Sequence, residues 1–476
     1  MLLAIDQGTT GTTCLVVDEE LRPRGRGYRE VRQHFPRSGW VEHDPEELWE
    51  SALAAAAEAL ADAGVEAGAL AAVGITNQRE TTVVWDRQKG RPVHRAIVWQ
   101  DRRTAERCRE LPRDLIRDRT GLVPDPYFSA TKLEWLLRER DAANLAFGTV
   151  DSWLLWKLTG GEVHTTDVSN ASRTLLFNLE TLDWDPDLLD LFGVPASVLP
   201  QIVSSSGIVG EGELLGAKVP VAGLAGDQQA ALFGQACFRP GQAKTTYGTG
   251  NFVLVNTGTK PEAPPDGLVR TVAWRLADEP AVYALEGSVF TTGAALQWLR
   301  DGLGVLVSAA ESEEIASALE GNEGVYFVPA LTGLGSPHWV PEARGVIAGL
   351  SRGVRGEHLV RAALEAIAYQ TRDVLDAMRV DFEVLRADGG GSANRFLMQF
   401  QADIARVPVE VPAERETTAL GAAALAGLGV GTWQSVDELA GAWRLAARYE
   451  PQMDAEEAER LLSEWRQAVS RALLQA

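Results

Sequence analysis

The chain of 476 residues has few cysteines, few histidines and a shortage of basic charge. Its three cysteines, Cys14, Cys108 and Cys237, lie far apart and form no CxxC pair, so we expect a reducing, cytoplasmic setting. The histidines include no HExxH motif, which disfavours a zinc site. Lys and Arg total 45 against 66 Asp and Glu, and the net charge of −21 argues against nucleic acid or an anionic membrane as the partner.

Long uninterrupted apolar runs are also missing. The first run ends at Asp6, and the Ala-rich stretch 48–74 is broken by acidic residues, so we expect neither a signal peptide nor a membrane-spanning helix. No GxxxxGK[ST] motif occurs, which disfavours a P-loop enzyme. The remaining composition, 45% hydrophobic and 23% charged, is ordinary for a globular protein, and the length predicts two large domains.

Short apolar strands bounded by glycine-containing turns alternate with helical stretches, which is the pattern of an α/β protein. Helices are expected over residues 46–63, 129–138, 294–301, 358–378 and 455–474. The turn signal FRPG at 238–241 predicts a boundary between a first domain, residues 1–237, and a second domain, residues 238–476.

The two halves of the chain open alike. A strand at 2–5, the polar turn DQGTTGTT at 6–13 and a strand at 14–17 are matched by a strand at 243–247, the turn GTG at 248–250 and a strand at 251–255. A third glycine cluster, DGGGSA at 388–393, runs into a helical segment at 394–404. Three small-residue turns at strand ends suggest one ligand held between two related domains.

These glycine and threonine turns suit a phosphate group. Their backbone N–H groups can converge on one acceptor, and the hydroxyls add further donors. Asp6, just before the first turn, is suited to hold hydrated Mg²⁺ against such a phosphate. A single turn of this kind also forms an ordinary Asx-type hairpin, and it is the repetition that favours the phosphate interpretation.

Polar side chains follow three further strands. Arg79 beside Glu80 supplies donors and acceptors for a small polyhydroxylated ligand, and Trp99 would provide a flat apolar wall. Alternatively, the charged pair is a solvated salt bridge and the tryptophan is core. Asp227 follows an apolar strand, where a carboxylate can take a proton from a substrate hydroxyl, and it also suits a helix N-cap.

In this order the segments resemble the FGGY carbohydrate kinases over nearly the whole chain, from residue 6 to about residue 433. The likeness rests on DQGTT (6–10), NQRETT (77–82), AIVWQ (96–100), DPYFS (125–129), NASRT (170–174), GDQQAA (226–231), TYGTG (246–250), TGLG (332–335) and FLMQF (396–400). RETT and DPYF resemble the members that phosphorylate glycerol and separate them from the xylulose and gluconate members.

The resemblance implies two ribonuclease-H-like α/β domains of the actin/Hsp70 type with a cleft between them. It also implies phosphoryl transfer from ATP, with Mg²⁺, to a terminal hydroxyl of glycerol, giving sn-glycerol 3-phosphate. By motif position, the glycerol pocket comprises Arg79, Glu80, Trp99, Tyr127, Asp227 and Gln228 in the first domain and Phe252 in the second, with Asp227 as the general base and Asp6 and Asp227 near the metal. The nucleotide site comprises Thr9, Thr10 and Gly11 in the first hairpin and Thr249, Gly293, Gln297, Gly390 and Asn394 in the second domain.

Two departures from the family pattern concern the nucleotide and its regulation. Thr13 stands where an arginine is common, so the phosphate charge must be met elsewhere. Residues 210–219 lack the glycine-rich basic loop that binds fructose 1,6-bisphosphate in some bacterial members, and they lack the histidine that the phosphotransferase system modifies in others. We therefore expect neither regulator to act. Family members suggest a homodimer or homotetramer.

Two other functions stay open at this point. One is a neighbouring FGGY kinase that acts on another polyol or sugar, which the set Arg79, Glu80, Tyr127 and Phe252 disfavours. The other is a catalytically silent nucleotide-binding scaffold, which the retention of two aspartates and both phosphate turns disfavours.

Overall fold

The computed structural model describes residues 1–277 and 279–474. Its first large sheet has six strands in the order β14-β15-β5-β1-β2-β3. Their bounds are β1 Leu2–Gln7, β2 Gly11–Val17, β3 Pro23–Glu30, β5 Ala72–Asn77, β14 Ser206–Leu214 and β15 Ala217–Gly226. The strand β1 is antiparallel to β2 and parallel to β5, which is parallel to β15.

The second large sheet has seven strands in the order β18-β19-β17-β16-β22-β23-β24. Their bounds are β16 Gln242–Tyr247, β17 Asn251–Gly258, β18 Val269–Trp274, β19 Val282–Val289, β22 Val384–Asp388, β23 Val409–Pro412 and β24 Leu445–Tyr449. Here β16 is antiparallel to β17 and parallel to β22, which is parallel to β23. The predicted likeness of the two chain halves is therefore confirmed, because β16, β17 and β22 repeat the arrangement of β1, β2 and β5.

The five long helices that the sequence predicts are all present, with ends within two residues of the expected ones. They are α1 Pro45–Ala63, α4 Ser129–Leu137, α9 Gly293–Asp301, α11 Gly356–Met378 and α15 Ala455–Leu473. The side chain of Asp44 caps α1 by accepting from the N–H of Glu46, and Gly64 ends it in the left-handed region at φ 65°. A Cβ on Gly27 of β3 would lie 2.0 Å from the carbonyl oxygen of Ala55, so the small residues let the helix pack directly on the sheet.

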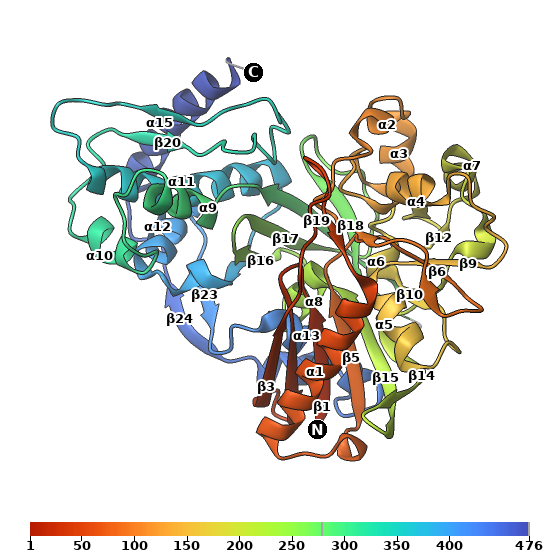
Figure 1. Cartoon of the computed structure of the whole chain (residues 1–476). Helices are drawn as coiled ribbons and strands as arrows, with labels where there is room; N and C mark the ends of the chain where they lie inside the picture. The colour runs from red at the N-terminus through yellow and green to blue at the C-terminus, as the bar shows by residue number, and fades with distance from the viewer. Residues whose placement is uncertain (278, 475–476) are drawn as a thin grey trace.

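Further helices and strands lie elsewhere in the described chain. The helices are α2 Ala105–Arg109, α3 Arg113–Thr120, α5 Val150–Leu158, α6 Val168–Ala171, α7 Pro186–Phe192, α8 Asp227–Gly234, α10 Glu311–Ser317, α12 Arg395–Ala405, α13 Thr417–Gly429 and α14 Val436–Ala442. The strands are β4 Glu42–His43, β6 Val83–Asp86, β7 Arg91–Pro92, β8 Ala96–Ile97, β9 Leu145–Gly148, β10 Thr165–Asp167, β11 Phe177–Asn178, β12 Asp183–Trp184, β13 Gln201–Val203, β20 Tyr326–Val328 and β21 Val346–Ala348. Figure 1 shows the two sheets on different sides of α8 and α13.

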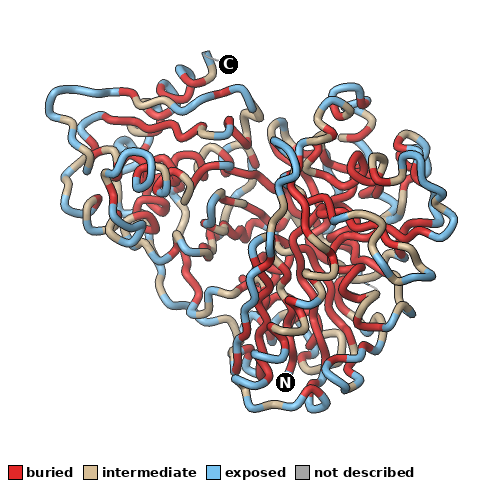
Figure 2. The backbone as a smooth tube through the Cα atoms, in the orientation of Figure 1, coloured by how far each residue is buried: buried red, intermediate tan, exposed pale blue. Residues whose placement is uncertain are grey.

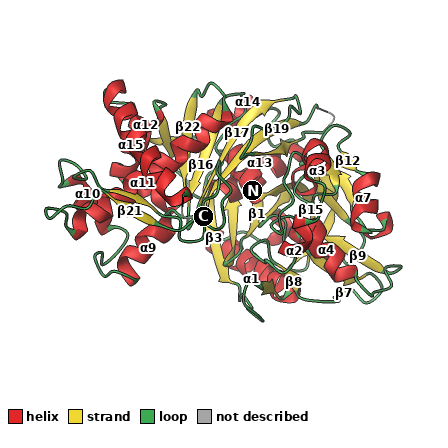
Figure 3. Ribbon diagram, turned by 90° about the horizontal axis from the view of Figure 1, so that it is seen from above, coloured by secondary structure: helices red, strands yellow, loops and turns green. Residues whose placement is uncertain are grey.

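The helix α13 joins the two parts of the chain although it lies near residue 420 in the sequence. It packs on β1, β5 and β15 of the first sheet and on α8. Figure 3 shows α13 next to β1. The approach is close because glycines line it. A Cβ on Gly74 would lie 2.1 Å from the carbonyl oxygen of Ala422, and a Cβ on Gly421 would lie 1.9 Å from that of Ala230. Late segments of the sequence therefore help to build the layer that supports the end of β15.

Buried residues concentrate along both sheets and the helices that cover them, and the exposed residues lie mainly in the outer loops and turns (Figure 2). The largest apolar cluster belongs to the second half and includes Tyr247, Tyr369 and Trp465. Among the residues that the structure describes, no helix is long and apolar enough to cross a membrane. The predicted boundary at residues 237 and 238 falls between α8 and β16 and stays a prediction.

Candidate active site

Charged side chains from both sheets meet in one buried cluster at the end of β5. Arg79 follows β5, is 2% exposed, and donates to Glu286 from Nη1 at 2.5 Å and from Nη2 at 3.1 Å. Its Nε lies 3.2 Å from Asp227 Oδ1 and 3.7 Å from Glu80 Oε1. Arg173 donates to Glu80 Oε1 at 2.6 Å and to Glu286 Oε1 at 2.9 Å. The cluster thus links the predicted pocket residues to a glutamate of β19 in the second sheet.

Burial and charge pairing determine the protonation of this cluster. Burial alone raises the pKa of a carboxyl group, because the charged form loses its hydration. At Glu286 the guanidiniums of Arg173 and Arg79 outweigh burial and lower the pKa to about 2. At Glu80 burial prevails and raises the pKa, although both arginines oppose it. The alternative of a solvated Arg79–Glu80 pair is wrong, because both side chains are almost fully buried.

The backbone of Glu80 adopts the left-handed region, with φ 61°. For a residue with a Cβ this conformation costs about 1–3 kcal/mol. Two hydroxyls hold it in place: Ser129 Oγ donates to the Glu80 carbonyl at 3.0 Å and Thr82 Oγ1 donates to it at 3.1 Å. This turn directs the carboxylate of Glu80 into the cluster.

An aromatic wall connects the cluster to the first glycine and threonine turn. Tyr127 accepts a hydrogen bond from Arg79 Nη2 at 3.2 Å, and its ring meets that of Trp99 edge-on at 5.6 Å between centroids. Trp99 Nε1 donates to Thr9 Oγ1 at 2.9 Å. The tryptophan is only partly buried, so the alternative that it is a core residue is wrong. The predicted glycerol residues and the predicted phosphate turn are therefore neighbours.

Two predicted metal ligands lie near each other at the carboxyl ends of β1 and β15. Burial raises the pKa of Asp6 well above its ordinary value, and the carboxylates of Asp227 and Glu416 add to this effect. Asp227 is the first residue of α8 and Gly226 is its N-cap, so the alternative that Asp227 is the cap is wrong by one position. Carboxylates that destabilise each other in the absence of a cation are a chemically suitable pair for Mg²⁺.

The second turn lies beside residues predicted to hold the nucleotide. Gly293 N donates to Gly248 O at 3.1 Å, and Thr292 Oγ1 donates to Thr249 O at 3.2 Å, so the start of α9 is tied to this turn. In both hairpins the first glycine donates across the turn, Gly8 to Gly11 and Gly248 to Gly250, each at 2.9 Å. Among the described residues, Thr9, Thr10 and Thr249 donate no backbone N–H to a protein acceptor, which leaves these groups available to a phosphate.

The remaining predicted site residues are not part of the buried charged cluster. Asn394 caps α12 by accepting from Leu397 N at 2.9 Å, a structural task that the sequence analysis did not assign to it. Gly390 lies in the glycine turn that touches the end of β16, where a Cβ on Gly391 would lie 2.7 Å from Tyr247 Cβ. Two predicted residues remain to be placed: Gln297 is exposed on α9, and Phe252 is partly buried against an apolar cluster that residues of both halves build.

Three residues of the cluster were missed by the sequence analysis. Glu286 lies in β19 and Arg173 in NASRT (170–174), and Lys244 lies in the middle of β16, the strand that leads into the second turn. The NASRT motif was a signal for Arg173, but only the fold shows that its side chain meets Glu80. Nothing in the spacing of Glu286 or Lys244 indicates burial, because buried charge is visible only once both sheets are assembled.

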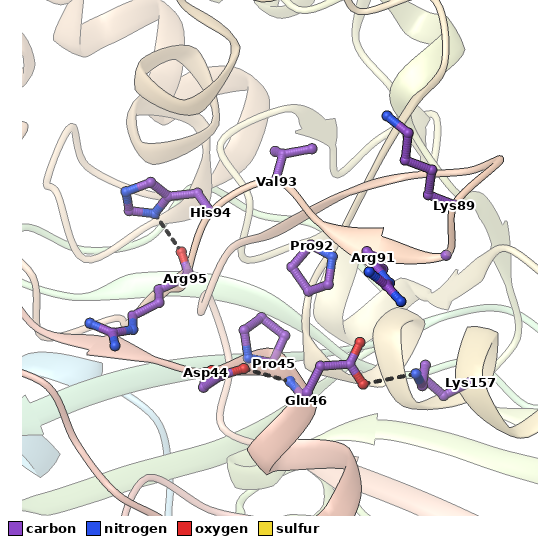
Figure 4. A pocket seen from close by; sticks show the side chains of 11 residues that line it. Asp44, Pro45, Glu46, Lys89, Arg91, Pro92, Val93, His94, Arg95 and Lys157 are labelled. Carbon is purple, nitrogen blue, oxygen red and sulfur yellow. Dashed lines mark hydrogen bonds and ion pairs between the residues drawn. The ribbon is translucent and has the colours of Figure 1, made fainter.

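Two surface cavities lie away from these residues. One of about 710 Å³ is lined by the start of α1 and by residues 89–95, including Lys89, Arg91 and Arg95. Figure 4 shows Lys89 and Arg95 pointing in different directions, and Lys157 already pairs with Glu46 at 2.8 Å. The other, of about 320 Å³, lies beside Arg270 and Met378. Neither cavity is lined by a predicted site residue, so the candidate site is defined by the buried cluster.

Comparison with known proteins agrees with this geometry. The N-terminal domain of the FGGY family of carbohydrate kinases matches residues 1–234, and the C-terminal domain of that family matches residues 243–430. The chain is 54% identical to Glycerol kinase 2 of Thermotoga maritima, over 99% of this chain and 98% of that protein. It is 53% identical to the glycerol kinase of Deinococcus radiodurans, over 99% and 97% of the two chains.

Solved structures show the same likeness. The Plasmodium falciparum glycerol kinase with ADP superposes with a TM-score of 0.93 at 37% identity, covering 99% of this chain and 98% of that one. A xylulose kinase from Rhodospirillum rubrum superposes with a TM-score of 0.86 at 26% identity, covering 98% of each chain. These matches confirm the predicted two-domain α/β fold of the actin/Hsp70 type, and the chain belongs to the FGGY family of carbohydrate kinases.

Proposed function

We propose that this protein transfers the γ-phosphoryl group of ATP to a terminal hydroxyl of glycerol and releases ADP and sn-glycerol 3-phosphate. The observation that carries the proposal is the match in sequence, above 50% identity over nearly the whole chain, to relatives named glycerol kinase. The buried cluster supports it, because Arg79, Glu80 and Tyr127 offer donors and acceptors to a small neutral triol.

Asp227 is the group we assign to proton removal. Its side chain is 28% exposed, whereas Arg79 and Glu80 beside it are almost fully buried, so it is the carboxylate of the cluster that a substrate can reach. Arg79 Nε at 3.2 Å holds its Oδ1, and the N–H of Gln228 donates to the same oxygen at 2.7 Å. The other carboxylate oxygen is then directed to a hydroxyl of the substrate. It accepts the proton of that hydroxyl while the hydroxyl oxygen attacks phosphorus.

The two turns are suited to hold the phosphates from opposite sides. Phosphoryl transfer requires alignment and charge neutralisation more than covalent help from the protein. The unused N–H groups of Thr9, Thr10 and Thr249 supply donors from both sheets. Thr13 brings no charge to the first turn: it lies opposite Asp6 in the register of β1 and β2. The neutralising charge must therefore come from outside that hairpin.

The carboxylates of Asp6 and Asp227 are the groups that would hold Mg²⁺, and the metal would supply charge neutralisation at the phosphates. Within the part of the chain that the structure describes, no three His, Cys, Asp or Glu side chains are grouped to hold a metal on their own. This fits an ion that shares its coordination between one or two carboxylates, phosphate oxygens and water.

An acceptor screen tests the proposal. ADP release is measured on the purified protein with ATP and Mg²⁺ against glycerol, dihydroxyacetone, xylulose, gluconate and no acceptor. We expect turnover with glycerol to exceed turnover with xylulose or gluconate by about 10²-fold or more, because polar groups left unpaired in the pocket penalise a poorly fitting ligand. Faster turnover with xylulose or gluconate would contradict the proposal, and ATP binding without any turnover would indicate a silent scaffold.

A further inference from the structure

Lys244 is a fully buried lysine that the proposed mechanism does not use. It lies in the middle of β16, and its side chain has no solvent exposure. Its Nζ donates to Gln228 Oε1 across the boundary between the sequence halves, and to Thr246 Oγ1 at 2.9 Å on its own strand. Both partners are neutral. A buried ammonium with neutral partners is costly unless something else in the molecule requires it.

The fold does not require a cation at this position. The last paired residues before the turn are Gln7 in β1 and Tyr247 in β16. Three residues before each of them stand Ala4 in β1 and Lys244 in β16, so these two residues occupy matching places. Ala4 is also fully buried and packs in an apolar cluster. The same strand, in the same sheet order, is therefore built with an alanine at that place, and the lysine serves something other than sheet formation.

Charged groups of both signs surround Lys244. Asp388 on β22, Asp227 on α8 and Glu286 on β19 favour its charged form, whereas Arg79 after β5 and the burial itself oppose it. Burial is the largest of these effects, and it lowers the pKa of Lys244 to about 8. Near pH 7 the ammonium form, with three donors and no acceptor, is therefore the main form.

We propose that Lys244 is a positioning residue that fixes the orientation of the Gln228 amide. Because an ammonium group can only donate, the amide oxygen of Gln228 must face it. The amide nitrogen with its two N–H groups then points away from Lys244 as a donor. Its ligand is an oxygen acceptor, either a hydroxyl of glycerol or an oxygen of the transferred phosphoryl group. This inference rests on the proposed function and deepens it.

The mechanism makes a specific prediction about two variants. In Lys244→Met the amide is free to turn, and in Gln228→Leu the donor is gone. We expect each variant to lower kcat/KM for glycerol by about tenfold, the effect of one lost hydrogen bond. Because the lysine acts through the amide, the double variant should lose no more than about twice what the worse single variant loses.

A matched control uses a buried carboxylate outside the site. Glu365 on α11 is 3% exposed and pairs with Arg361 at 2.8 Å. Glu365→Gln is expected to leave the activity unchanged, and its combination with Lys244→Met should reproduce the tenfold loss of the single variant. Lys244→Gln, which keeps an N–H donor toward Gln228, should lose less than Lys244→Met, and it replaces that variant in the cycle if the methionine prevents folding.

The outcomes separate the two proposals. Losses that multiply in the Lys244 and Gln228 double variant, in an enzyme whose wild type phosphorylates glycerol, would overturn the positioning role and leave the proposed function intact. A wild type that does not phosphorylate glycerol would remove both. A kcat/KM for glycerol in Lys244→Met equal to that of the wild type would also overturn the positioning role.

Discussion

The two large sheets share one strand arrangement but distribute their carboxylates differently. In the first sheet Asp6 lies on the central strand β1 and pairs in register with Thr76 of β5. In the second sheet the two residue types are exchanged: the threonine, Thr246, lies on the central strand β16, and it pairs in register with Asp388 of β22. The backbone geometry is repeated, whereas the acidic side chain has moved to the neighbouring strand.

The difference shows which of the two carboxylates, Asp6 or Asp388, is free to bind a ligand. Asp388 Oδ2 accepts hydrogen bonds from Gln235 at 2.9 Å and from Thr417 at 2.5 Å, so its carboxylate is used within the protein. Asp6 instead faces the like charges of Asp227 and Glu416. One sheet therefore supplies unsatisfied negative charge and the other supplies a buried cation. The fold supports both, and the function depends on the side chains placed at the strand ends.

The largest expected effect is on the link between the two sheets. Glu286→Gln removes the carboxylate that both Arg79 and Arg173 bind, and we expect a loss of about 3–5 kcal/mol in the free energy of unfolding at pH 7, because two buried guanidiniums lose the carboxylate that they share. Urea unfolding measures this loss.

The same carboxylate makes the stability depend on pH. The pKa of Glu286 is lowered to about 2, so the stabilisation by Glu286 is complete above the pKa of the unfolded chain and is lost as the pH falls. The wild-type and variant curves should therefore converge below pH 4.5. Parallel curves down to pH 2 would contradict this role.

The next effect concerns Asp227, the carboxylate that we assign to proton removal. Asp227→Asn keeps the size of the side chain and removes its basicity, so we expect the chemical step to slow by about 10²-fold or more while glycerol and ATP still bind. Single-turnover kinetics and equilibrium binding separate the two quantities. Near-normal turnover would show that the hydroxyl loses its proton without this group.

A smaller effect is expected on glycerol binding itself. Arg79→Ala removes charged hydrogen bonds in the pocket, and we expect glycerol to bind about 1–3 kcal/mol less tightly. The KM for glycerol and a direct titration at saturating ATP measure it. Because Arg79 also pairs with Glu286, the folded fraction of the variant must be checked in the same samples. An unchanged KM would exclude Arg79 from the pocket.

The comparison of the strand ends can be tested with two matched variants. Asp6→Asn should raise the Mg²⁺ concentration needed for half-maximal activity by about tenfold, because a neutral amide is a poor ligand for this ion. Asp388→Asn alters the corresponding carboxylate of the second sheet and should leave the Mg²⁺ requirement unchanged, since its oxygen is already bonded to Gln235 and Thr417. Equal shifts in both variants would contradict the assignment of the metal to the first sheet.

The smallest expected effect is that of fructose 1,6-bisphosphate on the rate with glycerol. Residues 206–226 form a hairpin of β14 and β15 closed by Leu215 and Gly216, both with positive φ, rather than an extended basic loop. We therefore expect fructose 1,6-bisphosphate to leave the rate with glycerol unchanged. A dose–response measurement checks it, and a several-fold change in activity would overturn the prediction.

Much of this arrangement could be predicted from local sequence. Strand and helix positions follow from short-range patterns, and α1 begins and ends at the cap residues Asp44 and Gly64. The repeated turns indicated a matching pair of hairpins. The burial of Arg79 and Glu80 could not be inferred in the same way, because an adjacent acid and base are usually solvated, and the carboxylate that pairs with the buried Arg79 here is Glu286, 207 residues away.

The sequence alone determined the family and the order of the elements, and it predicted the reactive groups, because these depend on local patterns and on motifs that lie within a few residues of each other. Only the tertiary structure decided which charges share a dry environment. Packing of α13 on the first sheet and of β19 beside the pocket brings Glu286, Arg173 and Lys244 to the predicted residues. The physical reason is that the strength of a charge interaction depends on distance and on burial, and both are set by contacts between segments far apart in the chain.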